Sequence, residues 1–379
     1  MRIAHLIDAL GWGGAQTLLL TFAESAQKYD VETMVIGVKP DRKKSPLPDL
    51  IRENGARVIS LTHRKIYDPA AVPTIVRLLK KEKIELVHTH LSHSNIYGCF
   101  AGKIVHIPSV ATLHNTHTNT YSTWRIRQSL EHCCLRYGVT RVIAVGQNVA
   151  AAYSSIVDPN KLDIIPNAVK SGKKISQEKK NALRSELMMG DSSRVLIVAV
   201  GRLTEQKGYY DMLTAFAQVC RQRTNTFLAI IGLGHLDEKL KEYASALNIM
   251  KNVHFVGSRA DVPEILAASD IFLNASHWEG LSIAMLEAMA AGLPVIATKV
   301  GDAEKLLANG GGVLVDAKDV QSLTAALVHL LDDQATRHLM GNLAKEFVEE
   351  NYSADAWFEK LLATYSRAIS DYKIGVNPN

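Results

Sequence analysis

The segment that most constrains the fold is Ala275–Thr298, ASHWEGLSIAMLEAMAAGLPVIAT, which predicts a turn, a helix, a second turn and a strand. An apolar strand, Ile271–Asn274, is predicted directly before it. Strands joined through a helix run parallel in one sheet, and open parallel sheets bind ligands outside the carboxyl ends of their strands. We therefore expect a ligand site at the start of the helix, formed by His277, Glu279, Gly280 and Ser282.

Two glutamates in this segment, Glu279 and Glu287, are eight residues apart. Eight helical residues span about 2.2 turns, so we expect both carboxylates on one side, about 12 Å apart, with Glu279 at the mouth of the site and Glu287 one layer down. A helix N-terminus suits a phosphate, because it carries unpaired N–H groups and a partial positive charge. The segment thus indicates a phosphorylated sugar. Such a pair of glutamates also occurs by chance in many helices. The prediction of a site therefore depends on the strands predicted before and after this helix.

Composition limits the class of protein. A chain of 379 residues, 47% hydrophobic and 21% charged, is long enough for two or three domains and is not typical of disorder. A net charge of +5 fits an anionic substrate or a membrane surface. No basic block interleaved with aromatic residues indicates a nucleic-acid partner. The four cysteines form no C-x-x-C pair, which favours a reducing compartment over a disulfide framework or zinc site.

The N-terminal sequence MRIAHLIDALGWGG is too polar for a signal peptide, and no run of 18 apolar residues indicates a membrane span. We therefore expect a cytoplasmic protein. Strand 2–7, a glycine-rich turn at Gly11–Gly14 and a helix over 15–27 begin a doubly wound domain. The dinucleotide fingerprint requires a glycine where Gln16 stands, which disfavours NAD.

The rest of the N-terminal half alternates strands with helices. We predict strands at 32–38, 58–61, 86–90, 109–114, 141–146 and 164–167, helices at 73–83, 95–104 and 121–137, a loop at 41–50 and a polar linker at 171–180.

Histidines gather at the ends of these strands. His88 and His90 alternate onto one face of their strand, which is a plausible metal-ligand pair. No acidic or cysteine partner is suitably spaced, so the favoured interpretation is polar groups that contact a ligand or one another. The remaining members of the group are His93, His114 and His117.

The predicted helix at 121–137 combines aromatic and basic side chains. Trp124, Arg125, Arg127 and Arg136 fit either an anionic membrane surface or an ordinary solvated face. The solvated face needs no partner and is the simpler interpretation.

The C-terminal half begins with Val195–Val200, a buried parallel strand. The loop Gly201–Gly208 follows, and its Arg202 and Lys207 suit a diphosphate beside a helix N-terminus. The loop is not a Walker P-loop, because G-K-[ST] is absent. Further strands are predicted at 227–232, 253–256 and 310–315, and helices at 208–221, 262–268, 321–332, 334–351 and 357–372. Two such series predict two doubly wound α/β domains.

Three motifs resemble the retaining glycosyltransferases of family 4. Glu279 to Glu287 is similar to the family's E-x7-E segment, Gly201-Arg202 to Lys207-Gly208 to its diphosphate loop, and Gly13-Gly14 to its N-domain glycine loop. The resemblance runs nearly end to end. It implies the GT-B fold: two facing Rossmann-like domains, with a C-terminal helix that crosses back to the N-terminal domain. The implied domains are 1–170 plus about 357–379, on the acceptor side, and 171–356, which binds the nucleotide-sugar.

The resemblance also implies roles for individual residues. Arg202 and Lys207 would neutralise the donor diphosphate as the sugar leaves, Glu279 would hold the sugar and its reacting centre, and His114 would sit beside that sugar. Glu287 would bind the ribose, and Gly257 and Arg259 the base. The implied donor-binding residues are completed by Gly14, Gly201, Gly280, Leu281 and Ser282, and the acceptor side by Gly13, Gln16, His90 and Asn115.

Two positions depart from the family pattern. Asn167 is followed by Ala168 rather than glycine, and Gly301 by Asp302, which places an acid near the expected donor site. The apolar spacing of Trp357, Phe358, Leu361, Leu362 and Tyr365 fits a terminal helix that docks on the first domain.

The function that the resemblance implies is transfer of a sugar, with retention and without a metal or other cofactor. The donor would be a UDP- or GDP-sugar and the acceptor a glycan or lipid-linked saccharide of a bacterial surface polymer, reached at the inner face of a membrane. Three alternatives remain open: a sugar-nucleotide epimerase, a phosphorylase of the same fold, and a non-catalytic sugar-nucleotide-binding protein.

Overall fold

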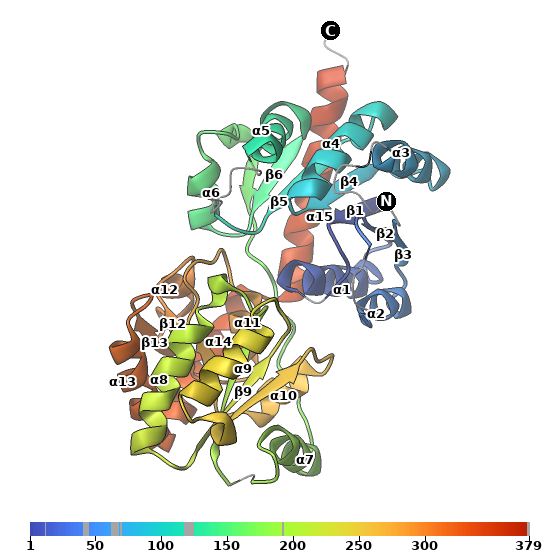
Figure 1. The fold of residues 1–379 in the computed structure, drawn as a ribbon. Coiled ribbons are helices and arrows are strands. Elements are labelled where there is room, and N and C mark those ends of the chain that lie inside the picture. Colours follow the sequence, from blue (N-terminus) through green and yellow to red (C-terminus); the bar gives the residue numbers. More distant parts are fainter. Residues whose placement is uncertain are drawn as a thin grey trace. The chain divides into compact units, whose positions relative to one another are not determined.

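The computed structural model describes residues 1–11, 13–40, 45–61, 68, 70–116, 125–191 and 193–376. The chain divides into two compact units, Met1–Asn167 with Ala354–Asn379 (unit 1) and Ala168–Ser353 (unit 2). Figure 1 shows the elements of both. Four features named above lie outside the described residues: Trp12, the first part of the predicted loop at 41–50, His117, and the start of the predicted helix at 121–137 with Trp124.

Unit 1 is built on a parallel sheet with the strand order β3-β2-β1-β4-β5-β6-β7. Its strands are β1 (Arg2–Ile7), β2 (Glu32–Gly37), β3 (Arg57–Ser60), β4 (Leu86–His90), β5 (Ser109–Leu113), β6 (Arg141–Ala144) and β7 (Leu162–Ile164). The central strands β4 and β5 are buried along their whole length, as expected for a parallel sheet covered on both faces.

Alternation along the strands sends side chains to two separate cores in unit 1. Ala4 and Leu6 of β1 pack with α3 and α4, whereas Ile7 packs with α1 and α2. The unit's helices are α1 (Gly14–Ala26), α2 (Leu47–Glu53), α3 (Ala71–Lys81), α4 (Ser92–Val105), α5 (Arg125–Cys133), the π-helix η2 (Cys134–Gly138), α6 (Gln147–Tyr153), the 3-10 helix η3 (Pro159–Lys161) and α15 (Ala354–Val376).

The C-terminal helix α15 belongs to unit 1, and its apolar stripe is buried as the spacing predicts. Phe358 and Tyr365 are fully buried, and the ring centroid of Phe358 lies 4.8 Å from that of Phe22 in α1. In Figure 1, α1 lies across the N-terminal end of α15. Helix α15 therefore completes the core that β1 and α1 begin.

Unit 2 repeats the same topology, with the strand order β10-β9-β8-β11-β12-β13. Its strands are β8 (Val195–Val200), β9 (Thr226–Ile231), β10 (Val253–Gly257), β11 (Ile271–Asn274), β12 (Val295–Thr298) and β13 (Gly312–Val315). Its helices are α7 (Gln177–Leu187), η4 (Glu205–Lys207), α8 (Tyr209–Gln222), α9 (Asp237–Ala246), η5 (Met250–Asn252), α10 (Val262–Ala268), α11 (Ile283–Ala290), α12 (Ala303–Leu306), α13 (Val320–Asp332) and α14 (Gln334–Asn351).

In both units the strand order reverses direction beside the first strand, between β1 and β4 and between β8 and β11. This reversal is the doubly wound arrangement, and it leaves a crevice at the carboxyl ends of those two strands. The loops that follow β8 and β11 are therefore the place to look for a ligand site in unit 2.

Several predicted bounds differ from the structure, and the predicted helix at 121–137 is, where described, α5 followed by the π-helix η2. The predicted loop at 41–50 is already helical from Leu47, because Pro48 is tolerated in a first helical turn. The predicted linker at 171–180 becomes helix α7 at Gln177, where the Ser176 side chain accepts a hydrogen bond from the Lys179 N–H at 3.2 Å and caps the helix. The strand predicted at 164–167 ends earlier, at Ile164.

Candidate functional site

Two loops meet at the crevice of unit 2, the loop after β8 (Gly201–Gly208) and the loop after β11 (Ala275–Ser282). Gly208 joins them and has a φ of +61°. A Cβ at this position would lie 2.0 Å from the Ala275 carbonyl oxygen and 3.2 Å from Nε2 of His277. The contact between the loops therefore requires glycine here, both for its backbone conformation and for its size.

Glu279 lies in this second loop, four residues before the first residue of α11. The expectation that Glu279 and Glu287 occupy one helix, about 12 Å apart along it, is therefore wrong. The sequence EGLS has no residue that marks the start of the helix before Ser282, which occupies the N-cap. The Glu279 side chain therefore points toward the loop after β8 and not along the helix.

The carboxylate of Glu279 is held by three donors. Lys207 forms an ion pair with its Oε1, the Ser276 hydroxyl donates to the same oxygen at 2.8 Å, and Gln206 Nε2 donates to Oε2 at 3.4 Å. The two charged side chains are only 17% and 10% exposed. The loops thus bring a cation and a carboxylate together at the strand ends, where the sequence analysis placed both.

The remaining cation of the β8 loop, Arg202, has an exposed side chain. Lys207 folds back along the loop, and its Cε lies 3.1 Å from where a Cβ of Gly201 would be. The Gly201 carbonyl accepts a hydrogen bond from the Tyr209 hydroxyl at 3.1 Å, which anchors the loop to α8. One short loop therefore presents two cations of different accessibility.

His277 is positioned beside this pair rather than at a helix N-terminus. Its Nε2 lies 2.7 Å from Oδ2 of Asp211 in α8, and its backbone N–H donates to the Gln206 carbonyl at 2.7 Å. These contacts tie the two loops together from the outer side.

Glu287 lies on α11, partly buried. Burial raises the pKa of its carboxyl group to about 7, and the nearby charge of Lys170 offsets only part of this effect. Glu287 is therefore an acid that changes its charge near neutral pH.

A small pocket opens between the β11 loop and α12. Its lining includes Asn274, Glu279, Gly280, Ser282, Thr298 and Leu306. Asn274 Nδ2 donates to the Ser282 hydroxyl at 3.4 Å, and Leu281 beside them is buried. Polar groups of the predicted donor-binding set thus line this pocket.

The unusual pair Gly301-Asp302 borders the same loop. Gly301 has a φ of +57°, and a Cβ there would lie 2.1 Å from the Gly280 carbonyl oxygen. The Asp302 N–H donates to that same carbonyl at 3.1 Å. The departure from the family pattern therefore places an acidic residue against the loop that holds Glu279.

Arg259 has its own carboxylate partners within unit 2. Its guanidinium donates to both oxygens of Asp261 at 2.7 Å and pairs with Glu186, and these hydrogen bonds raise the pKa of the guanidinium. Gly257, at the end of β10, has a φ of +80° and open space around its Cα. A nucleobase that contacts Arg259 would have to share its guanidinium with the carboxylates of Asp261 and Glu186.

In unit 1, the glycine turn after β1 is closed by Gln16. Its Nε2 donates to the Ala9 carbonyl at 3.0 Å, and its Oε1 lies 2.6 Å from where a Cβ of Gly13 would be. Gly14 is exposed at the first position of α1, and Asn115 is exposed after β5. The Gln16 side chain thus packs against Gly13 and is tied to the end of β1 through Ala9.

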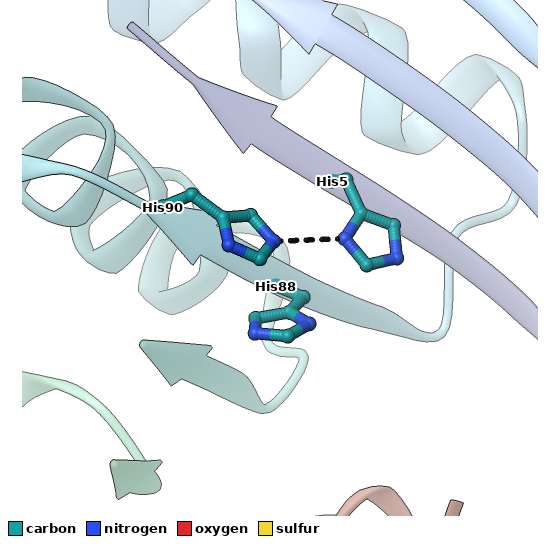
Figure 2. Close-up of side chains that lie close together, drawn as sticks. All are labelled: His5, His88 and His90. Carbon is teal, nitrogen blue, oxygen red and sulfur yellow. Dashed lines mark hydrogen bonds between the residues drawn. The ribbon is translucent and has the colours of Figure 1, made fainter. Parts of the chain in front are cut away.

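The histidines at the ends of β1 and β4 converge on one face of the sheet (Figure 2). His5 is the register partner of His88, and His90 lies two residues further along β4. Nδ1 of His5 lies 3.1 Å from Nε2 of His90, whose Nδ1 lies 3.1 Å from Nε2 of His114. His90 is only 3% exposed, whereas His114 is partly exposed.

His88 is held separately from this row. Its Nδ1 lies 2.6 Å from the Tyr365 hydroxyl and its Nε2 lies 2.6 Å from the Thr112 hydroxyl. The ring nitrogens of His5, His88 and His90 come within 4.8 Å of one another, which is the geometry that the metal interpretation requires. The same nitrogens contact one another and hydroxyl groups, which is what the alternative interpretation expects.

A polar cluster that the sequence analysis missed lies at the ends of β1 and β2. Oδ2 of Asp8 lies 3.0 Å from Nδ1 of His93 and 3.2 Å from Nζ of Lys39, and Oδ1 accepts from the Ser94 N–H at 3.1 Å. Burial alone would raise the pKa of Asp8, but the His93 hydrogen bond and the Lys39 charge lower it to about 2. The only sequence signal was that each residue follows a strand.

Comparison with known proteins shows which protein family the chain resembles. Residues 12–172 match the family described as Glycosyltransferase Family 4, and residues 190–347 match Glycosyl transferases group 1. The Escherichia coli enzyme UDP-Gal:alpha-D-GlcNAc-diphosphoundecaprenol alpha-1,3-galactosyltransferase is 31% identical over 92% of both chains. N-acetyl-alpha-D-glucosaminyl L-malate synthase of Bacillus anthracis is 25% identical over 82% of this chain and 81% of its own.

Solved structures agree in fold. Anabaena HepE in complex with UDP-glucose matches with a TM-score of 0.85 at 21% identity, over 97% of this chain and 100% of its own. WaaG, a glycosyltransferase involved in lipopolysaccharide biosynthesis, matches with a TM-score of 0.74 at 18% identity, over 94% and 98%. Two parallel doubly wound sheets with these neighbours define the class of proteins with the GT-B fold.

Within that class, the chain belongs to glycosyltransferase family 4. The fold and the family expected from the three motifs are thus confirmed. No helix among the described ranges has the length and apolar character needed to span a bilayer.

Proposed function

We propose that the chain is a retaining glycosyltransferase that moves a hexosyl or N-acetylhexosaminyl group from a UDP- or GDP-sugar to a hydroxyl of a glycan or lipid-linked acceptor. The observation that carries this proposal is the contact of Lys207 with Glu279 at the crevice of unit 2. A nucleotide diphosphate needs a cation, and a departing sugar needs a carboxylate close to that cation. The two loops supply both.

Each of the two cations has a separate task in this proposal. Arg202 is exposed and can reach an incoming diphosphate, whereas Lys207 is already ordered by Glu279. Charge grows on the diphosphate as the bond to the sugar breaks, so fixed cations stabilise the transition state more than the ground state. A preorganised donor of this kind contributes about 3–4 kcal/mol.

Glu279 is proposed to hold hydroxyls of the transferred sugar and to face its reacting centre, and Glu287 to bind the ribose. Unit 2 is then the donor-binding domain and unit 1 the acceptor side, to which Gly13 and Asn115 are assigned. Two residues of unit 1 are assigned to the donor instead: His114 would sit beside the transferred sugar, and Gly14 would bind the donor. Because the leaving phosphate can take the proton of the acceptor hydroxyl, retention needs no separate protein base. We also propose that the reaction needs no metal ion, since the two cations of the β8 loop neutralise the diphosphate.

The relative from Escherichia coli suggests which substrates to test first. Its name specifies UDP-galactose as the donor and a diphosphoundecaprenol-linked N-acetylglucosamine as the acceptor. We propose a UDP-sugar and a lipid-linked saccharide of bacterial surface polysaccharide assembly for this chain as well.

A nucleotide panel followed by a reaction assay tests this function. UDP, GDP and their sugars are titrated by calorimetry, and each sugar that binds is then incubated with and without a diphosphate-linked N-acetylglucosamine acceptor. A transferase releases the nucleoside diphosphate only with acceptor. Conversion of the sugar without acceptor would instead show an epimerase, and binding without either reaction would show a non-catalytic protein.

A lipid-linked acceptor requires contact with a membrane, and unit 1 offers a surface for it. Phe100 and Ile104 of α4 are 41% and 52% exposed, and Tyr137 of η2 is 66% exposed. Two cations border them: Lys103 donates to the Tyr137 carbonyl at 3.3 Å, and Arg136 stacks over the Tyr137 ring at 5.4 Å. Apolar side chains ringed by cations suit an anionic bilayer.

Co-sedimentation with vesicles tests this membrane contact. The wild type is expected to sediment with anionic vesicles and less with neutral ones, and Phe100→Ser with Ile104→Ser should reduce sedimentation. Equal sedimentation of wild type and double variant would rule out this surface.

A further inference from the structure

The row of imidazoles that runs from His5 through His90 to His114 leads from the core of unit 1 to its surface. His5 and His90 are 1% and 3% exposed, whereas His114 is partly exposed. Figure 2 shows the first contact of the row as a dashed line, with the His88 ring close by but not hydrogen-bonded to either ring. Burial lowers the pKa of His5 to about 3 and that of His114 to about 4, and it also lowers the pKa of His90. All three rings are therefore neutral at pH 7, and each carries one N–H.

Two hydrogen bonds between three neutral rings permit only two arrangements of the protons. If His5 donates from Nδ1, His90 must accept at Nε2 and therefore donates from Nδ1 to Nε2 of His114. His114 then carries its own proton on Nδ1. In the opposite arrangement all three protons sit on Nε2, and every donor in the row reverses. A mixed arrangement loses a hydrogen bond, so the three rings share one tautomer.

The buried end of the row selects between these arrangements. Within the described residues Nε2 of His5 is buried without a hydrogen-bond partner, and the Phe22 ring lies 4.2 Å from the His5 ring, centroid to centroid. With protons on Nδ1 this atom is an unused acceptor, whereas with protons on Nε2 it is a buried orphan N–H. Orphaned buried donors are the rarer and costlier case.

We propose that the row His5–His90–His114 fixes the proton of His114 on Nδ1, so that His5 and His90 are positioning residues for His114. Nδ1 of His114, which makes no hydrogen bond within the row, then presents an N–H donor rather than a lone pair. A hydroxyl oxygen of a sugar or a phosphoryl oxygen can accept from it. This consequence for the reaction rests on the proposed function, because His114 is there assigned to the transferred sugar. The assignment of the tautomer does not rest on the proposed function.

The tautomers can be read directly by NMR. Long-range proton–nitrogen correlation spectra of the full chain, with ¹⁵N-labelled histidine, distinguish Nδ1–H from Nε2–H rings. The expected spectrum has His5, His90 and His114 all in the Nδ1–H form at pH 7.5. Any of the three in the Nε2–H form would overturn the proposal without the need for a variant.

Substitutions at the buried end test whether the row transmits this choice. His5→Asp replaces the first donor with an acceptor near the Nδ1 position, which can accept from Nε2–H of His90 and should bring an Nε2–H signal at His114, whereas His5→Asn of the same shape can keep an N–H there and should preserve the Nδ1–H form. The control is His88→Phe, equally buried on the same face but outside the row, which should leave His114 unchanged. An unchanged His114 signal in folded His5→Asp would overturn the positioning role.

The reaction gives a second readout. His5→Asp should lower kcat about tenfold, because His114 then presents a lone pair in place of its N–H, while KM for the sugar nucleotide stays within twofold, and His5→Asn should keep most of the wild-type kcat. Wild-type protein with the expected spectrum but without transferase activity would contradict the proposed function and leave the tautomer assignment standing.

Discussion

The effect of Glu287 on the free energy of unfolding is the prediction whose magnitude follows most directly from the structure. Burial raises the pKa of its carboxyl group from 4.5 to about 7. Between these values the folded chain keeps a proton that the unfolded chain releases, so the free energy of unfolding falls as pH rises through this interval. The full penalty is present above pH 7, and this difference in pKa corresponds to at most about 3 kcal/mol. Glu287→Gln has nearly the same shape and no charge, so it should escape the penalty.

The assay is urea unfolding of the full chain at pH 4.5, 6 and 8, with hydrogen exchange of the α11 amides to identify the transition that includes this helix. The stability of Glu287→Gln relative to wild type should increase by up to about 3 kcal/mol from pH 4.5 to pH 8. Exposed Glu304→Gln is the matched control and should show no such trend. A relative stability of Glu287→Gln that is flat or falls with pH would refute the reasoning.

Three further predictions concern catalysis, packing and metal dependence. Lys207→Met should lower kcat/KM by about 10²–10³, because a fixed cation at the leaving group is lost, whereas exposed Lys239→Met should not change it; near-normal turnover would remove Lys207 from the mechanism. Phe358→Ala should destabilise unit 1 by about 3–5 kcal/mol, because a fully buried ring is deleted, and thermal unfolding should show a clear loss that exposed Lys360→Ala does not. EDTA should leave transfer within twofold of its starting rate, and a loss restored by a divalent cation would contradict metal independence.

The strands that position both sites could be predicted from the sequence because buried parallel strands are short apolar runs. Val195–Val200 and Ile271–Asn274 match their predicted bounds, and so does β4. The order in which the strands assemble follows from alternation with helices, which allows few topologies. The docking of α15 also follows from its pattern, since an apolar stripe at helical spacing must be covered.

The geometry around Glu279 could not be predicted in the same way. A spacing of eight residues has a helical meaning only if both residues are helical, and the loop before Ser282 removes that condition. The contact with Lys207 depends on Gly208, whose importance lies in a close approach between two loops 67 residues apart, Gly208 and Ala275. The spacing of residues along the sequence does not predict such a close contact between two loops.

Long-range partners were the other kind of feature that the sequence did not reveal. His5 belongs to the histidine row because of its register with His88 across two strands, and Tyr365 reaches His88 from the opposite end of the chain. Arg259 is engaged by Glu186, which is 73 positions earlier. Each of these contacts depends on tertiary packing rather than on local pattern.

The central claim is that the loops holding Lys207 and Glu279 support transfer of a sugar with retention. The most direct test is to incubate the protein with UDP-galactose and a diphosphate-linked N-acetylglucosamine acceptor and to determine the anomeric configuration of the new bond by NMR. The account predicts a product with the α configuration of the donor, lost in Glu279→Gln. A β-linked product, or an α-linked product formed equally well by Glu279→Gln, would contradict it.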